Sequence, residues 1–355
     1  MAGNLKVVDL HGSYREMGRQ YGALMKNDLN EMYDNISADF GKKPGANYDG
    51  FLKVGRAYYN SYPQRYREVL NGIGETSGLG LDKELIINSI ELNYLKSRGA
   101  CSGIAAWGNY TSGEPLVFGR NFDWINLNNH FSVAVYNPDD GNIPVACVGY
   151  TGCVYVCTGM NKNGVFLELN NGMFVEAIDF GNRVLAMASL FSFLEDSQNL
   201  DQLDIQFHTA RPTQTTIINV ANQTGAYSYE WATFDVKRRG PDKDGLLVGT
   251  NQFVDPSWGI NLAGDTFIAG QNFDMAKTNE RRQNLLALGE KYKGNITPET
   301  MMEIISLPIE DGGASFIPSH HTSYQVVAVP ENLTMWVRIP YYQDWVEVDL
   351  KPLFS

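Results

Sequence analysis

The pattern of hydrophobic residues changes abruptly at Cys101, and this change limits the possible folds more than any other feature of the sequence. Before it, apolar residues such as Met17, Tyr21 and Leu24 recur at three- and four-residue spacing, which is the period of an amphipathic helix. After it, short apolar runs are separated by turn signals such as residues 161–164, which is typical of strands. The sequence therefore predicts a helical segment followed by sheets.

The first hundred residues are predicted to be almost entirely helical. Ser13 and Glu16 have the spacing of a capping box, so a helix is expected to begin after Ser13. Further helices are expected over 50–62, 64–75 and 82–97, the last with Asp82 as its N-cap. No Pro- or Ser-rich spacer marks the boundary at 100/101.

The remaining residues predict two clusters of strands, each adjoining a pair of helices. Helices are expected near 182–208, 274–292 and 297–306, the last with Thr297 as N-cap and Pro298 in the first position. This order suggests sheets that lie between layers of helices. Strands are expected near 101–107, 115–121, 131–136, 143–150, 153–158, 165–170, 214–220, 225–237, 245–250, 322–329, 333–339 and 344–349.

Charge and composition exclude several classes of function. The 28 Lys and Arg against 40 Asp and Glu give a formal charge of −12, which disfavours nucleic-acid binding because phosphate contacts dominate that affinity. No run approaches the ~20 apolar residues of a membrane helix. Four cysteines in 355 residues are too sparse for a disulfide scaffold.

The compartment is left open by the sequence. The first residues lack the apolar core of a signal peptide. Export followed by removal of a signal is favoured slightly, and a cytoplasmic location is the alternative.

Cys101, Arg120 and Asp123 are expected to meet in space. Cys101 opens one expected strand, and the other two residues lie where its partner strand ends. A guanidinium beside a thiol favours the nucleophilic thiolate, and a nearby carboxylate can orient an amine. Taken alone, the pattern also fits a buried structural cysteine beside a surface ion pair.

An ordered set of motifs extends over most of residues 10–340. The segments are His11–Gly22, Cys101–Ile104 with Gly119–Trp124, Gly159–Gly172, Val248–Phe253 and Val326–Trp336. Together they resemble the cysteine N-terminal-nucleophile (Ntn) hydrolases, which include penicillin V acylases, bile salt (choloylglycine) hydrolases, acid ceramidase and the acyl-CoA:6-aminopenicillanate acyltransferases. The segment His11–Gly22 resembles the leader of the acyltransferase branch in particular.

The resemblance implies an α+β fold, a four-layer αββα sandwich of antiparallel sheets between helices, with a helical N-terminal leader. It divides the chain into a leader, residues 1–100, which stays packed on the core after cleavage, and a catalytic core, residues 101–355. It implies hydrolysis of linear amides through an acyl-cysteine, after self-cleavage before Cys101. It implies no cofactor and no metal.

The resemblance also assigns roles to single residues. Cys101 is the nucleophile and, through its new α-amine, the base; an α-amine titrates near ~7.7–8.0 and can accept a proton at neutral pH. Arg120 stabilises the thiolate, and Asp123 holds the α-amine. Asn170 and Asn251 match the asparagines that build or support the oxyanion hole, with Asn171 as the competitor of Asn170.

One departure from the family bears on the substrate. The late arginine of bile salt hydrolases has no obvious match in residues 312–321, which weakens a bile-salt assignment. The expected partner is a small N-acyl amide with an apolar or aromatic acyl group, and a homo-oligomer is left open. Aromatic residues flank the motifs, and five of them are assigned to an acyl pocket: Trp107, Phe122, Trp124, Tyr150 and Phe174.

Alternative interpretations remain open at this point. An acyltransferase would use the same acyl-enzyme with an amine acceptor, a non-catalytic binding protein would keep only the fold, and a third alternative is a cysteine enzyme that never cleaves. His320 and His321 lack the further ligands of a zinc site. Buried thiols are the favoured interpretation of Cys147, Cys153 and Cys157. The helical group Asp201, Asp204 and His208 has no matching serine.

Overall fold

The computed structural model describes residues 5–42, 46–93, 100–124, 130–176, 183–258, 277–319 and 321–355. Within these ranges, no helix combines the length and the hydropathy needed to cross a membrane.

The strands of the described residues form two sheets, one of eight strands in the order β1-β4-β5-β6-β7-β8-β9-β10 and one of six in the order β11-β2-β3-β12-β13-β14. Neighbouring strands are antiparallel except for β1 and β4, which are parallel. The strands are β1 (Lys6–Gly12), β2 (Ala100–Ala106), β3 (Val117–Asp123), β4 (Phe131–Pro138), β5 (Val145–Tyr150), β6 (Thr158–Asn161), β7 (Phe166–Glu176), β8 (Gln214–Asn222), β9 (Gly225–Trp231), β10 (Val236–Arg239), β11 (Leu246–Gly249), β12 (Thr322–Val329), β13 (Thr334–Ile339) and β14 (Gln343–Asp349).

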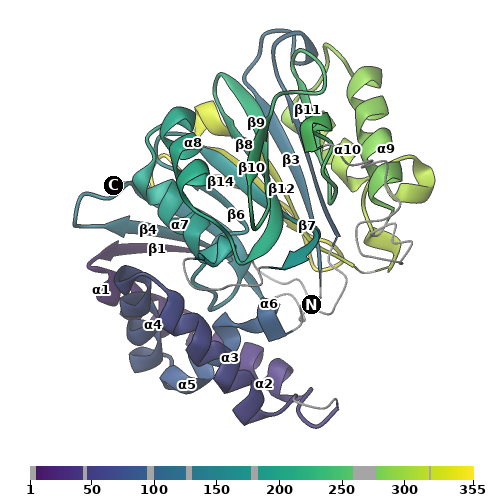
Figure 1. Ribbon diagram of the computed structural model, residues 1–355. Coiled ribbons are helices and arrows are strands. Elements are labelled where there is room, and N and C mark those ends of the chain that lie inside the picture. The colour runs from purple at the N-terminus through teal and green to yellow at the C-terminus, as the bar shows by residue number, and fades with distance from the viewer. Residues whose placement is uncertain are drawn as a thin grey trace.

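Helices cover the outer face of each sheet. Helices α7 and α8 pack on β5, β6 and β8 of the larger sheet, whereas α9 and α10 pack on β2, β3, β11 and β12 of the smaller one (Figure 1). The result is the expected α+β sandwich with four layers in the order αββα. The α-helices are α1 (Tyr14–Leu24), α2 (Lys26–Ser37), α3 (Tyr48–Ser61), α4 (Gln64–Thr76), α5 (Leu81–Asn88), α6 (Ile90–Asn93), α7 (Ala186–Asp196), α8 (Leu200–Thr209), α9 (Thr278–Lys291) and α10 (Pro298–Ser306).

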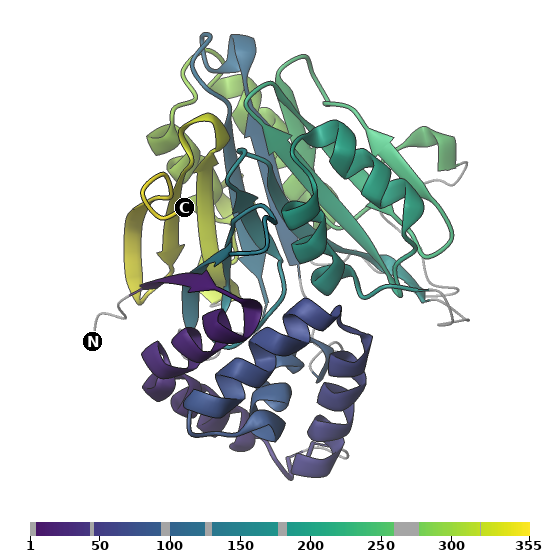
Figure 2. The same ribbon diagram turned by 90° about the vertical axis from the view of Figure 1, so that its left-hand side faces the viewer.

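The periodicity predicts an almost entirely helical N-terminal segment, but the structure also contains a strand there. Its first strand, β1, lies along β4 at the edge of the larger sheet, and its helices gather at one end of the two sheets (Figure 2). Its side chains also bond the core backbone: the Tyr21 hydroxyl accepts from Gly152 N at 3.0 Å and Asn88 Oδ1 accepts from Val154 N at 2.7 Å. The segment before Cys101 is therefore built into the core. The division of the chain at residue 100 stays a prediction.

Local signals set several element ends. Ser13 and Thr297 cap α1 and α10 as expected, accepting hydrogen bonds from Glu16 N and Thr300 N. Asp82 is not an N-cap, since α5 begins at Leu81 after Gly80, and the expected helix over 82–97 breaks near Ser89. Its last residues, 94–97, lie outside the described residues.

Three expected elements differ from the observed ones. The helical spacing over 182–208 corresponds to a pair of helices, α7 and α8, which begins four residues later than expected. The strand expected over 153–158 begins only at Thr158, because residues 151–157 form an irregular turn that faces the leader. The strand expected over 225–237 divides into β9 and β10.

Candidate active site

Cys101 lies in β2 at a point where this strand has a neighbouring strand on one side only. On one side it pairs with Phe122 of β3. On the other side β11 ends at Gly249, opposite Gly103. Continuing that register by two residues would place Asn251 opposite Cys101. The backbone of Cys101 therefore lacks a strand partner on this edge, and side chains take that place.

Asn251 and Arg281 bond the backbone of Cys101. Cys101 N donates to Asn251 Oδ1 at 3.0 Å, and Arg281 Nη1 donates to Cys101 O at 2.8 Å. The two side chains also bond each other, because Arg281 Nη2 donates to Asn251 Oδ1 at 2.6 Å. Asn251 is held in turn by its N–H bond to Thr278 Oγ1 at 2.9 Å. Both polar groups of the Cys101 backbone are thus fixed by fully buried side chains.

Arg120 lies beside the sulfur of Cys101, with Nη2 at 4.0 Å from Sγ. It forms a buried ion pair with Glu168 of β7 and donates to Leu169 O at 2.9 Å. Its guanidinium also lies 5.2 Å from the ring centre of Phe122. Because Arg120 spans the space between the two sheets, it links the β2–β3 hairpin, which carries Cys101, to β7.

Two cross-strand glycines make room for this ion pair. A Cβ on Gly103 would lie 2.4 Å from Glu168 Oε1, and a Cβ on Gly249 would lie 2.2 Å from Asn219 Nδ2. Asn219 donates to the same Glu168 carboxylate, and Asn170 Nδ2 does so at 3.0 Å. Glu168 therefore receives donors from three side chains, as a buried carboxylate requires.

Burial keeps the thiol of Cys101 protonated in this structure. Removal from water raises its pKa to about 12, and the charges of Asp123 and Glu168 add to the rise, whereas Arg120 and a hydrogen bond from the Asp123 backbone lower it. The role expected for Arg120, stabilising the thiolate of Cys101, stays a prediction. Arg120 acts in the expected direction, but burial outweighs it and Glu168 opposes it.

Asp123 is held at one oxygen only. Thr322 Oγ1 donates to Asp123 Oδ1 at 2.6 Å, whereas Oδ2 is buried without a hydrogen-bond partner. Burial raises the pKa of Asp123 to about 7, against the charges of Arg281 and Arg120 and the bond from Thr322. This carboxyl therefore exchanges a proton near neutral pH.

Asn170 and Asn171 face different ways along β7. The side chain of Asn170 lies with Glu168 and, at 3.5 Å, with Gly249 O, and its Oδ1 is buried without a partner. Asn171 meets the site through its backbone, where its carbonyl accepts from Asn251 Nδ2 at 2.8 Å. The structure thus brings Cys101, Arg120, Asp123, Asn170 and Asn251 into one buried network.

The expected acyl-pocket residues are only partly near this network. Phe122 is the cross-strand partner of Cys101, and its ring lies 5.9 Å from that of Tyr150. Trp124 follows Asp123 and donates its backbone N–H to His321 O. Trp107 lies six residues from Cys101 at the opposite end of β2, about 20 Å away at strand rise, so the structure does not bring it to the site. The side chain of Phe174 lies outside the described residues.

The other candidate groups lie elsewhere or face other partners. Cys157 lies 3.4 Å from a carboxylate oxygen of Glu91, and Cys153 lies 3.6 Å from Ile87 O, so both thiols lie against the N-terminal segment that precedes Cys101. His320 lies outside the described residues. Among the residues that are described, no three His, Cys, Asp or Glu side chains are grouped to hold a metal ion.

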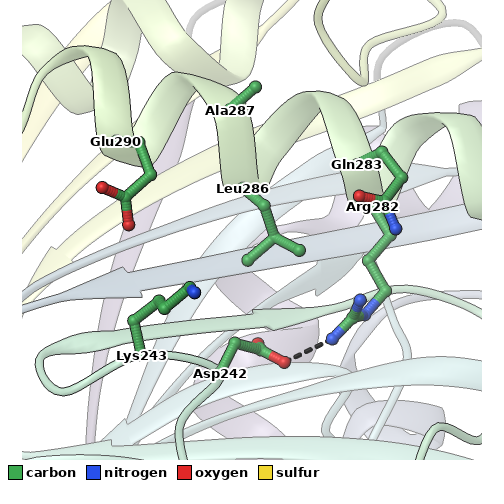
Figure 3. A pocket seen from close by; sticks show the side chains of 7 residues that line it. All are labelled: Asp242, Lys243, Arg282, Gln283, Leu286, Ala287 and Glu290. Carbon is green, nitrogen blue, oxygen red and sulfur yellow. Dashed lines mark hydrogen bonds and ion pairs between the residues drawn. The ribbon is translucent and has the colours of Figure 1, made fainter.

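A cavity of about 480 Å³ lies between α9 and the β10–β11 loop (Figure 3), and Cys101 is not among the residues that line it. It is bounded by the β10–β11 loop and contains the ion pair between Arg282 and Asp242. Arg281, the preceding residue on α9, instead contacts Cys101. No cysteine or serine lines the cavity, so we place the candidate site at Cys101.

Sequence reasoning missed Glu168, Arg281 and Thr322. Glu168 carries a signal, since it is a charged residue inside an apolar strand segment and two positions from Asn170. Arg281 lies 180 positions from Cys101 in a helix without a motif. It provides an arginine at the site, whereas residues 312–321, where the family pattern places one, contain none.

No protein-family model matches the chain, and no curated protein matches it by sequence. Solved structures do resemble it. Penicillin V acylase from Agrobacterium tumefaciens superposes with a TM-score of 0.52 and 10% identity, covering 72% of this chain and 88% of that one. A single-substitution variant of conjugated bile acid hydrolase from Clostridium perfringens superposes with a TM-score of 0.50 and 13% identity, covering 72% and 94%.

These identities are low, so the two superpositions bear on the fold and not on the reaction. Both solved proteins are Ntn hydrolases. The two sheets between helix pairs and the superpositions agree, and the chain has the fold of the N-terminal-nucleophile hydrolases.

Proposed function

We propose that this protein is a cysteine amidohydrolase that cleaves linear amide bonds of N-acyl compounds after cutting its own chain before Cys101. The observation that carries the proposal is the set of side-chain contacts that position Cys101. Its N–H is bound by Asn251, its carbonyl by Arg281, and its sulfur lies beside Arg120. Every buried backbone needs partners for its N–H and C=O, but at Cys101 buried side chains supply them, and an arginine lies beside the sulfur. The chain shares its fold with a penicillin V acylase and a conjugated bile acid hydrolase, and the proposal is compatible with that fold.

The position of Asp123 supports the proposed self-cleavage. The Ala100–Cys101 bond lies beside it in the β2–β3 pairing. Asp123, with a pKa of about 7 and an unpartnered oxygen, takes the thiol proton as Sγ attacks the carbonyl carbon of Ala100. The peptide C–N bond breaks, its nitrogen takes a proton to become the α-amine of Cys101, and water hydrolyses the resulting thioester. A new base then stands next to the nucleophile.

Turnover uses that α-amine. It takes the thiol proton as Sγ attacks the amide carbonyl of the substrate and gives the proton to the leaving amine. Water then attacks the acyl-cysteine, returns a proton to the α-amine and releases the carboxylic acid. Asn251 Oδ1, which already accepts from Cys101 N, orients the α-amine, with Asp123 as its second partner. Asn170 supplies an amide donor near the developing oxyanion.

The substrate class that we propose is a neutral acyl group, apolar or aromatic. Arg120 and Arg281 are fully buried and bonded to Glu168, Cys101 and Asn251. These contacts commit both arginines to the protein rather than to an anionic ligand. Buried aromatic rings, Phe122 and Tyr150 among them, lie by the nucleophile strand. Each buried methylene contributes about 0.8 kcal/mol, which gives selectivity for chain length.

The motif at His11–Gly22 does not favour acyl transfer over hydrolysis, because it has a packing role. Within it, Gly18 faces Val69 of α4, where a Cβ would lie 2.1 Å from the backbone oxygen. A motif that closes two helices together gives no information about an acyl acceptor.

The test combines electrophoresis and turnover. We expect wild-type protein to give pieces of about 11 and 28 kDa, in the ratio of 100 to 255 residues of a 39.6 kDa chain, and to hydrolyse neutral N-acyl amides. Cys101→Ala should stay one band and be inactive. An active wild type that remains one chain would contradict the cleavage, and activity in Cys101→Ala would contradict the nucleophile.

A further inference from the structure

Asp123 is held in place by a side chain from a distant part of the chain. Thr322 opens β12 and is the cross-strand partner of Asp123 in β3. Its hydroxyl lies 2.6 Å from Asp123 Oδ1, and both residues are buried. The two positions are 199 residues apart, and no motif in the sequence links them.

A second hydrogen bond bears on the direction of this one. Phe316 N donates to Thr322 Oγ1 at 2.8 Å. A hydroxyl has one proton and two lone pairs; one lone pair accepts from Phe316 N, and the proton points to Asp123 Oδ1 when that carboxylate is ionised. Thr322 therefore acts as a donor toward the carboxylate, and a donor to a carboxylate favours the ionised form.

The segment that carries Thr322 is itself anchored to the site. The guanidinium carbon of Arg281 lies 5.4 Å from the ring centre of Phe316, and Arg281 is the residue that bonds Cys101 O. Trp124 N donates to His321 O at 3.0 Å. Phe316 and His321, which lie on either side of this turn, are thus both anchored to residues near Asp123.

We propose that Thr322 is a positioning residue that favours the ionised form of Asp123 and occupies one of its oxygens, so that Oδ2 is left for the amino group of Cys101. Oδ2 is buried and has no hydrogen-bond partner in the intact chain. This inference rests on the proposed function, because the amino group exists only after cleavage. Without the hydroxyl, Asp123 would hold its proton to higher pH and could turn either oxygen toward the amine.

The test uses a pair of variants that differ in the hydroxyl. Thr322→Val keeps the branched shape and removes the donor, whereas Thr322→Ser keeps the donor. We expect Thr322→Val to move the acidic limb of the pH profile of kcat/KM upward by about one pH unit, the size of one charge-assisted hydrogen bond. Thr322→Ser should restore the wild-type limb. In an Asp123→Asn background, Thr322→Val should cause no further loss.

Two outcomes would overturn the proposal. One is an equal loss at every pH with an unmoved acidic limb, which would mean that Thr322 only supports the fold. The other is a full additional loss in the Asp123→Asn background, which would mean that Thr322 acts through another group.

A measurement without turnover separates this proposal from the proposed function. In the Cys101→Ala chain, NMR of ¹³C-labelled aspartate carboxyls can follow Asp123, identified by the signal that Asp123→Asn removes. We expect its pKa to rise when Thr322→Val is added and to return with Thr322→Ser. An unchanged pKa would refute the role of Thr322 even in an active enzyme. If no amide is hydrolysed, the proposed function fails, and the titration still decides the role of Thr322.

Discussion

Replacing Glu168 by Gln tests the ion pair that links β3, the strand beside Cys101, to β7. Glu168 and Arg120 are both fully buried. Glu168 accepts from Arg120, Asn170 and Asn219. In the Gln variant the charge of Arg120 loses its buried counterion, and an amide NH2 faces side chains that are themselves donors. Glu168→Gln therefore breaks the pair while nearly preserving the shape of the side chain.

The expected cost is large for a single substitution. Removing one partner of a buried ion pair costs about 3–5 kcal/mol of unfolding free energy. With an unfolding entropy of about 2.1 cal/mol/K per residue, a chain of 355 residues should lose about 4–7 °C in its melting midpoint. Differential scanning calorimetry and urea titration measure the two quantities.

A matched control separates this effect from the loss of any carboxylate. Glu347 lies on β14 and is exposed, so Glu347→Gln should change the free energy of unfolding by less than about 0.5 kcal/mol. If Glu168→Gln costs no more than this control, Arg120 does not depend on Glu168, and the argument for a pair between the sheets is refuted.

Two further changes test other parts of the site and the leader. Arg281→Met removes the donor to Cys101 O and Asn251 Oδ1 and should slow turnover at least about tenfold. The control is Arg282→Met, which should not slow turnover, because the Arg282 side chain pairs with Asp242 (Figure 3). Equal losses of kcat/KM in the two variants would show that Arg281 has no role in the site. Burial raises the pKa of Glu84 well above its usual range, and neither of its oxygens has a hydrogen-bond partner. Its neutral form therefore stabilises the fold fully below the unfolded pKa of about 4.3, and this contribution is lost as pH rises toward the folded value. Glu84→Gln should flatten the fall of stability as the pH rises above about 4.3 in urea titrations, and an unchanged slope would show that Glu84 is not the group that titrates.

The sequence predicts the parts of the site that lie in one hairpin or in a recognisable motif. Cys101, Arg120 and Asp123 come together because β2 and β3 pair end to start. The position of Asn251 follows from a motif that ends β11 just where the register would reach Cys101. Local signals of this kind are contained in a few adjacent residues.

The missed residues depend on contacts between distant elements. Arg281 reaches Cys101 from α9, and Thr322 reaches Asp123 from β12. Neither contact has a local pattern. Strand β1 was missed for the same reason, since Val7 and Val8 become a strand only by pairing with β4, about 126 positions later. The raised pKa of the Cys101 thiol could not be predicted from the sequence, because it results from burial by elements that are distant along the chain.

The measurement that tests the central claim most directly is the mass of the acyl-enzyme. A reaction with a neutral N-acyl amide is quenched in acid during steady turnover, digested with trypsin and analysed by mass spectrometry. The account predicts that the peptide Cys101–Arg120, which begins with the nucleophile as its first residue, gains the mass of the carboxylic acid less one water. An acyl group on a different residue, or steady hydrolysis by the Cys101→Ala variant, would contradict it.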